Sequence, residues 1–131
     1  MYEYKEPLQS GGYLIVKPNT WYIQYYFPGP DMRYNGTFKF ISNKEIDFYI
    51  NAWKNNFSKY KKLKSELDPL SSFNTQGELG MNIYIGGIMD GVCIDFYNMN
   101  VRTQEDLNKI INDYKKAKER ASKIQELLLS I

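Results

Sequence analysis

The chain has 131 residues, a net charge of +2, one cysteine and no histidine, and 16% of its residues are aromatic. This length suits a single core, so we expect one domain over residues 1–131, in which residues 1–10 could form a flexible arm. The small net charge argues against a nucleic acid or an anionic membrane as partner. The absence of histidine removes the commonest metal ligand, and one cysteine excludes an internal disulfide, so we expect no metal, no cofactor and a reducing compartment.

No segment approaches the ~20 consecutive apolar residues that a membrane-spanning helix needs. The N-terminal segment is charged and lacks the apolar stretch of a secretory signal. We therefore expect a cytoplasmic protein with no membrane partner.

The first part of the chain predicts an antiparallel hairpin. Residues 13–17 and 20–27 are rich in β-branched and aromatic side chains, and they flank the turn pair Pro18-Asn19. Centring the loop on this pair places Val16 opposite Trp21 and, because side chains alternate, separates a core face from a second face. The second face carries Tyr13, Ile15, Tyr22, Gln24 and Tyr26.

A third strand is predicted over residues 37–41, after the turn pair Asn35-Gly36. Phe38 and Phe40 share one side of this strand. We assign Lys39 to the open face of the predicted sheet.

Two helices follow from capping signals and apolar spacing. Residues 42–45 match a capping box, and apolar residues then recur at helical spacing as far as Leu67, before Asp68-Pro69 ends the pattern. Residues 103–106 form a second capping box before a helix that runs toward the C-terminus. Residues 70–78, after the first helix, are interpreted as a polar loop.

A second hairpin is predicted from residues 80–88 and 92–98, with Asp90-Gly91 as its type I′ turn. This register places Tyr84 opposite Tyr97 and Gly86 opposite Asp95 on one face. The element order is therefore βββ-α-ββ-α, and we expect an α+β two-layer sandwich with a mostly antiparallel sheet. Both amphipathic helices should cover the same face of that sheet.

The uncovered face of this sheet is the candidate site. Tyrosine gives a partner a large contact area with few torsions to immobilise. Lys39 and Asp95 add charge complementarity. Three alternatives remain open: aromatic pairs that only stabilise the sheet, a loop or N-terminal arm that covers the face, and burial in a homodimer. The candidate partner-binding residues are Tyr22, Tyr26, Lys39, Tyr84, Asp95 and Tyr97.

We expect a non-enzymatic protein that binds and occludes a protein partner, by the logic of small immunity proteins, antitoxins and phage-type inhibitors. The alternative is a binder of a planar, nucleotide-like small molecule, including one whose pocket a homodimer creates. An enzyme is the third interpretation, but without histidine no catalytic constellation is recognisable. Cys93 is interpreted as a small apolar filler, and the basic run from Lys59 to Lys64 as a complement to the helix dipole.

Overall fold

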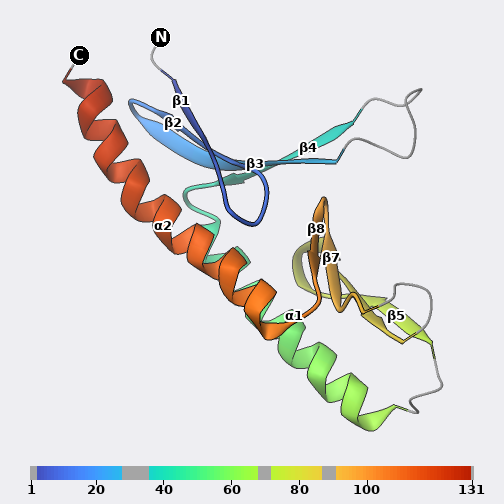
Figure 1. The fold of residues 1–131 in the computed structure, drawn as a ribbon. Coiled ribbons are helices and arrows are strands. Elements are labelled where there is room, and N and C mark those ends of the chain that lie inside the picture. Colours follow the sequence, from blue (N-terminus) through green and yellow to red (C-terminus); the bar gives the residue numbers. More distant parts are fainter. Residues whose placement is uncertain (1–2, 28–35, 68–71, 87–90, 131) are drawn as a thin grey trace.

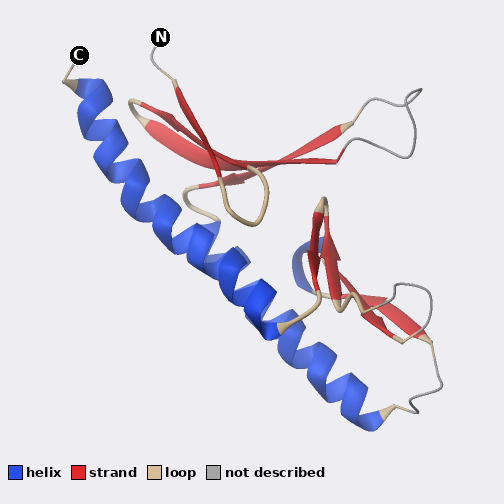
Figure 2. Ribbon diagram, viewed as in Figure 1, coloured by secondary structure: helices blue, strands red, loops and turns tan. Residues whose placement is uncertain are grey.

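The computed structural model describes residues 3–27, 36–67, 72–86 and 91–130. Its elements in chain order are β1 (Tyr4–Pro7), β2 (Tyr13–Lys17), β3 (Thr20–Phe27), β4 (Thr37–Ser42), α1 (Ile46–Glu66), β5 (Phe73–Gln76), the 3-10 helix η1 (Glu78–Gly80), β6 (Asn82–Ile85), β7 (Ile94–Phe96), β8 (Met99–Val101) and α2 (Gln104–Leu129). Strands β1 to β4 pair in order as one antiparallel sheet, called sheet A, and β5 to β8 pair in order as a second, called sheet B. With the two helices this is the predicted α+β fold, although its strands are divided between two sheets (Figure 1, Figure 2).

Helix α2 is the element that runs along both sheets (Figure 1). It packs against β2 of sheet A and, near its N-terminal end, against β8 of sheet B. Helix α1 packs against α2 and against strands β6 and β7. Sheet A therefore has an inner face, which packs on α2, and an outer face, which points away from this helix.

The core joins the two sheets around Phe96 of β7. Its ring centroid lies 6.2 Å from that of Tyr25 in sheet A and 5.9 Å from that of Trp53 in α1, and both contacts are edge-on. The Tyr114 hydroxyl of α2 accepts hydrogen bonds from the Tyr25 hydroxyl at 2.8 Å and from Trp53 Nε1 at 2.9 Å. These four side chains are buried, and they belong to one hydrophobic core that both sheets and both helices share.

The β2–β3 hairpin has the predicted register. Val16 lies opposite Trp21, and Ile15 lies opposite Tyr22. Every second residue of these strands is buried on the inner face, which confirms the predicted core face. The buried residues of that face are Leu14, Val16, Trp21, Ile23 and Tyr25.

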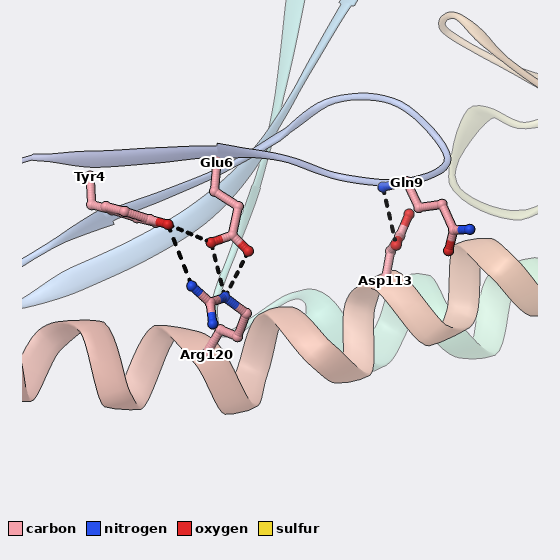
Figure 3. A network of polar contacts seen from close by, with 5 residues as sticks. All are labelled: Tyr4, Glu6, Gln9, Asp113 and Arg120. Atoms are coloured by element: carbon pink, nitrogen blue, oxygen red, sulfur yellow. Dashed lines mark hydrogen bonds and ion pairs between the residues drawn. The ribbon is translucent and has the colours of Figure 1, made fainter.

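Within the expected flexible arm, residues 4–7 form strand β1, which pairs antiparallel with β2. The loop that follows β1 is held by Asp113 of α2, a carboxylate that is only 5% exposed. This carboxylate accepts a hydrogen bond from the backbone N–H of Gln9 at 3.3 Å (Figure 3). It also accepts from the backbone N–H of Ser10 at 2.8 Å and from the Ser10 hydroxyl. A buried charge is tolerated here because several donors compensate for its lost hydration.

A second contact between β1 and α2 lies two turns further along the helix. The Arg120 guanidinium pairs with the Glu6 carboxylate at 2.7 Å, and the Tyr4 hydroxyl donates to the same carboxylate at 2.8 Å (Figure 3). Together with the Asp113 contacts, these bonds fix β1 as the edge strand of sheet A.

The register of the β6–β7 hairpin differs from the predicted one by four residues, because Asp95 lies opposite Asn82 rather than Gly86. An even shift leaves the side chains of the paired residues on their expected faces, so Ile83 and Ile94 still point into the core. The expected pairs Tyr84–Tyr97 and Gly86–Asp95 are therefore wrong. Asp90 of the predicted turn lies outside the described residues.

Two further strands in sheet B were not predicted. The β7 strand ends at Phe96, and a turn at Tyr97 and Asn98 returns the chain as β8, so that Phe96 lies opposite Met99. Tyr97 adopts a φ of 55°, a left-handed conformation that is uncommon for a residue with a side chain. The expected polar loop at residues 70–78 contains β5, which pairs with β6.

The capping signals are confirmed for α2 and only in part for α1. At α2 the Thr103 hydroxyl accepts from the Asp106 N–H at 3.2 Å, and Asp106 accepts in return from the Thr103 N–H. At α1 the Glu45 carboxylate accepts from the Ser42 N–H at 3.1 Å, but the helix begins only at Ile46 and its N-cap residue makes no side-chain cap. Residues 43–45 form a turn instead of the first helical residues.

Candidate functional site

The outer face of sheet A carries a row of aromatic side chains, which we call the aromatic face and define as Tyr13, Tyr22, Tyr26, Phe38 and Phe40. Phe38 and Phe40 of β4 are 54% and 50% exposed, and Tyr13 and Tyr26 are each 41% exposed. Tyr22 is half-buried. Large aromatic side chains exposed together in this way are typical of a surface that another molecule covers.

Strand register is what brings these rings together. Tyr26 lies directly opposite Phe38, and their centroids are 4.8 Å apart. Phe38 and Phe40 lie two residues apart on β4, so they share a face, and their rings stack at 6.1 Å. Tyr22 continues the row with an edge-on contact of 5.5 Å to Phe40. These contacts link the rings of Tyr22, Phe40, Phe38 and Tyr26 into one continuous row.

Two lysines border the aromatic face on its β1 and β2 side. The Lys5 ammonium lies 4.2 Å from the ring centroid of Tyr13, and the Lys17 ammonium lies 5.8 Å from that of Tyr22. Both are within the range of a cation–π interaction. Lys17 also pairs with the Glu3 carboxylate at 4.0 Å, so its charge is partly offset, and Lys5 is the better placed of the two to meet negative charge on a partner.

The placement of Lys39 on the open face was wrong. Lys39 lies opposite Tyr25, so its side chain projects from the inner face of sheet A. Its ammonium lies 5.7 Å from the ring centroid of Tyr49 in α1. A hydrogen-bonding contact with the Tyr49 side chain raises the pKa of the Lys39 ammonium. Phe38 and Phe40 take the outward positions, and the strict alternation of the sequence from residue 37 to residue 41 was the signal that could have shown this.

The other predicted site residues lie in sheet B. We call the face of sheet B that is opposite to the buried Ile83 and Ile94 its outer face. Tyr84 lies opposite Asn74 on this outer face, and Asp95 lies between Asn82 and Asn100 on the same face. Tyr97 occupies the β7–β8 turn, and its ring meets the Phe96 ring edge-on at 4.9 Å. The structure therefore gathers Tyr22 and Tyr26 on the aromatic face and leaves Tyr84, Asp95 and Tyr97 on a separate surface.

Two of the clefts that border these surfaces are lined by residues of both sheets. The first has a volume of about 490 Å³ and lies where the aromatic face meets the β7–β8 turn. The second has a volume of about 310 Å³ and lies between the ends of β3 and β4 and the outer face of sheet B. The first is lined by Lys5, Gly12, Tyr13, Gln24, Tyr26, Phe38 and Asn98, and the second by Phe27, Thr37, Gly80, Asn82, Asp95, Phe96 and Tyr97.

Glycine is required beside the first cleft. Gly12 has a φ of +82°, and a Cβ at this position would come within 2.5 Å of the Tyr25 ring and 2.7 Å of the Gln24 carbonyl oxygen. The β1–β2 loop can therefore lie against β3 only with a glycine here. The close approach places Tyr13 and Gln24 in one wall of the cleft.

Neither a cluster of metal ligands nor an exposed thiol is present among the described residues. Among those residues no three His, Cys, Asp or Glu side chains gather closely enough to hold a metal ion. Cys93 is buried, and its thiol lies 3.2 Å from the carbonyl oxygen of Arg102, which it can reach as a donor. This placement agrees with its interpretation as a small filler of the core.

Comparison with protein-family models, with curated proteins and with solved structures finds no match to this chain. Neither of the two described helices combines the length and the apolar content that crossing a membrane requires. The aromatic face and its clefts are therefore the features from which we infer a function.

Proposed function

We propose that the chain is a non-enzymatic binding protein that occludes a protein partner, and that the aromatic face is its contact surface. The observation that carries this proposal is the exposure of four aromatic side chains, at 41% to 54%, on one face of a single sheet. Covering apolar surface contributes about 25 cal/mol per Å² removed from water, and aromatic residues dominate the binding energy of protein interfaces. The aromatic face therefore exposes more aromatic surface than the pairing of its own strands requires, and this surface is available to a partner.

The scaffold behind the aromatic face supports this function. Strands β2 and β3 are backed by the buried inner face, and β1 is fixed to α2 through Asp113 and Arg120. A rigid surface loses little conformational entropy when it binds, so more of its contact energy becomes affinity. Small inhibitors that block a partner by steric cover depend on such preorganisation.

Site-specific photo-cross-linking in cells of the native host tests the proposal. A p-benzoylphenylalanine residue replaces Phe40 on the aromatic face, and in a matched control it replaces Phe48, which is 69% exposed on α1. We expect a one-to-one covalent adduct with one host protein from position 40 and none from position 48. Equal adducts from both positions, or adducts only with a second copy of the chain, would contradict the proposal.

A second candidate function is supported by the first cleft. Its volume of about 490 Å³ exceeds the ~300 Å³ that a small-molecule site needs, and its walls include the rings of Tyr13 and Tyr26. The Lys5 ammonium at the same cleft could pair with an anionic group. These features suit a planar anion such as a nucleoside monophosphate, which would stack on the rings.

Thermal-shift measurement with nucleoside monophosphates tests this second candidate. A ligand of the cleft should raise the melting temperature of the wild-type protein but not that of the Tyr26→Ala variant. The Phe48→Ala variant, altered at an exposed aromatic residue of α1, should respond like the wild type. If no nucleotide shifts the wild-type transition, the cleft does not bind this class of ligand.

A further inference from the structure

The second cleft differs in chemistry from the aromatic face. Two partly exposed aromatic residues, Phe27 and Tyr97, form part of its lining, and the Asp95 carboxyl lies in the same cleft beside the Asn82 amide. Among the described residues that line it, Asp95 is the only one that carries a charge. Its volume of about 310 Å³ is large enough for the end of a long side chain.

The carboxyl group of Asp95 lies in surroundings that favour a cation. Its cross-strand neighbours are the neutral amides Asn82 and Asn100, and in the described part of the chain no lysine or arginine forms an ion pair with it. Partial burial raises the pKa of the Asp95 carboxyl, because the charged form loses hydration in the cleft. A cation that enters the cleft would replace that hydration.

We propose that this cleft receives an arginine side chain of the partner protein, with the guanidinium on the Asp95 carboxylate and between the rings of Phe27 and Tyr97. A guanidinium fits better than an ammonium, because it is planar, stacks on aromatic faces and can donate to a carboxylate through two N–H groups. The Asn82 amide oxygen provides a further acceptor at the same cleft. This inference rests on the proposed function, since it gives the chemistry of one anchor on the partner.

The cleft and the aromatic face are close enough for one partner to reach both. Tyr26 and Phe38 belong to the aromatic face, and the next residue along β3 and the preceding residue along β4 are Phe27 and Thr37, which line the cleft. Because side chains alternate across a strand, the two sites lie on opposite faces of the same strand ends. A partner that covers the aromatic face and extends past these ends would bring a side chain to Asp95.

The experiment uses a probe that needs no partner. The uniformly ¹⁵N-labelled chain is titrated with Nα-acetyl-arginine methyl ester and, separately, with the citrulline ester, a neutral molecule of nearly the same shape. We expect saturable amide shifts at Gly80, Asp95 and Tyr97 with the arginine ester only. The Asp95→Asn variant should bind it at least tenfold more weakly, whereas Glu119→Gln, which removes an exposed carboxylate of α2, should bind it like the wild type.

Equal shifts with the citrulline ester, or shifts that survive in Asp95→Asn, would overturn the inference. The spectrum of Asp95→Asn shows whether the variant is folded, and Asp95→Ser serves as a second variant if it is not. An arginine anchor can fail in this experiment while cross-linking at position 40 still succeeds, so the two proposals fail separately.

Discussion

The Tyr25 hydroxyl donates a 2.8 Å hydrogen bond to the Tyr114 hydroxyl, and this bond joins sheet A to helix α2 at the centre of the core. The same Tyr114 oxygen accepts from Trp53 Nε1 of helix α1, so three elements depend on one acceptor. Burial raises the pKa of both tyrosine hydroxyls, because the phenolate would have no water around it. The network is therefore neutral over the physiological pH range.

Replacing the shared acceptor should cost more than replacing one donor. Tyr114→Phe leaves the Tyr25 hydroxyl and the Trp53 N–H without a partner, and each buried orphan costs about 1–3 kcal/mol. Tyr25→Phe removes only one donor from the network. Urea denaturation should therefore show a larger loss of unfolding free energy for Tyr114→Phe, and equal losses for both variants would show that Tyr114 is not the common acceptor.

The Asp113 carboxylate should control the stability of the N-terminal edge of sheet A. Asp113→Asn replaces one acceptor oxygen by an amide that faces the N–H groups of residues 9 and 10. Loss of a charged acceptor costs about 1.5–3 kcal/mol. Hydrogen exchange should accelerate in residues 4–12 more than in β3, whereas a uniform acceleration would show that the contact does not act on this loop in particular.

The capping box of α2 predicts both a stability change and a pH dependence. Thr103→Ala should lower the unfolding free energy by about 1 kcal/mol. The backbone N–H groups of Arg102 and then Thr103 hold the pKa of the Asp106 carboxyl below its usual range. A lowered folded-state pKa contributes stability at neutral pH that is lost as the pH falls below about 4.

Denaturation of Asp106→Asn at several pH values checks this sign. The variant should lose part of the stability difference between neutral and acid pH that the wild type shows. An unchanged pH profile would exclude a contribution of Asp106 to acid unfolding.

Truncating a side chain should cost much less stability on the outer face of sheet A than on the inner face. Phe38→Ser on the aromatic face removes an exposed ring and cross-strand contacts worth about 0.2–1 kcal/mol each, so the fold should persist. Ile23→Ala on the inner face removes a fully buried side chain and should cost about 2–5 kcal/mol. Thermal unfolding of the two variants compares these costs, and a larger loss for Phe38→Ser would mean that the ring belongs to the core.

The β2–β3 hairpin could be predicted in register because two independent signals agree there. The Pro18-Asn19 pair fixes the loop, and the apolar alternation fixes the faces. The third predicted strand, which is β4 in the structure, has the same alternation, but Lys39 was assigned to the open face by its polarity. In the structure its ammonium reaches the ring of Tyr49 from the inner face, so a charged residue is accommodated beside the core.

Sheet B was harder to predict because its turns and edge strand carry weak signals. The β7–β8 turn uses Tyr97 at positive φ, where a glycine would have marked it. Strand β5 is mostly polar, since Asn74 and Gln76 point away from the core, and polar residues without apolar alternation resemble a loop. Asp95 alternates with the buried Ile94 and Phe96 along β7, but its cross-strand neighbours Asn82 and Asn100 depend on a register and a turn that were not predicted.

Affinity capture from a lysate of the native host, quantified by mass spectrometry, tests the central claim most directly. The wild type is compared with the Phe38→Ser/Phe40→Ser double variant and with Phe48→Ser, which removes an equally large exposed ring outside the aromatic face. We predict a host protein held at one-to-one stoichiometry by the wild type and by Phe48→Ser, and lost from the folded double variant. Capture of the same proteins by all three forms would contradict the assignment of the aromatic face as the contact surface.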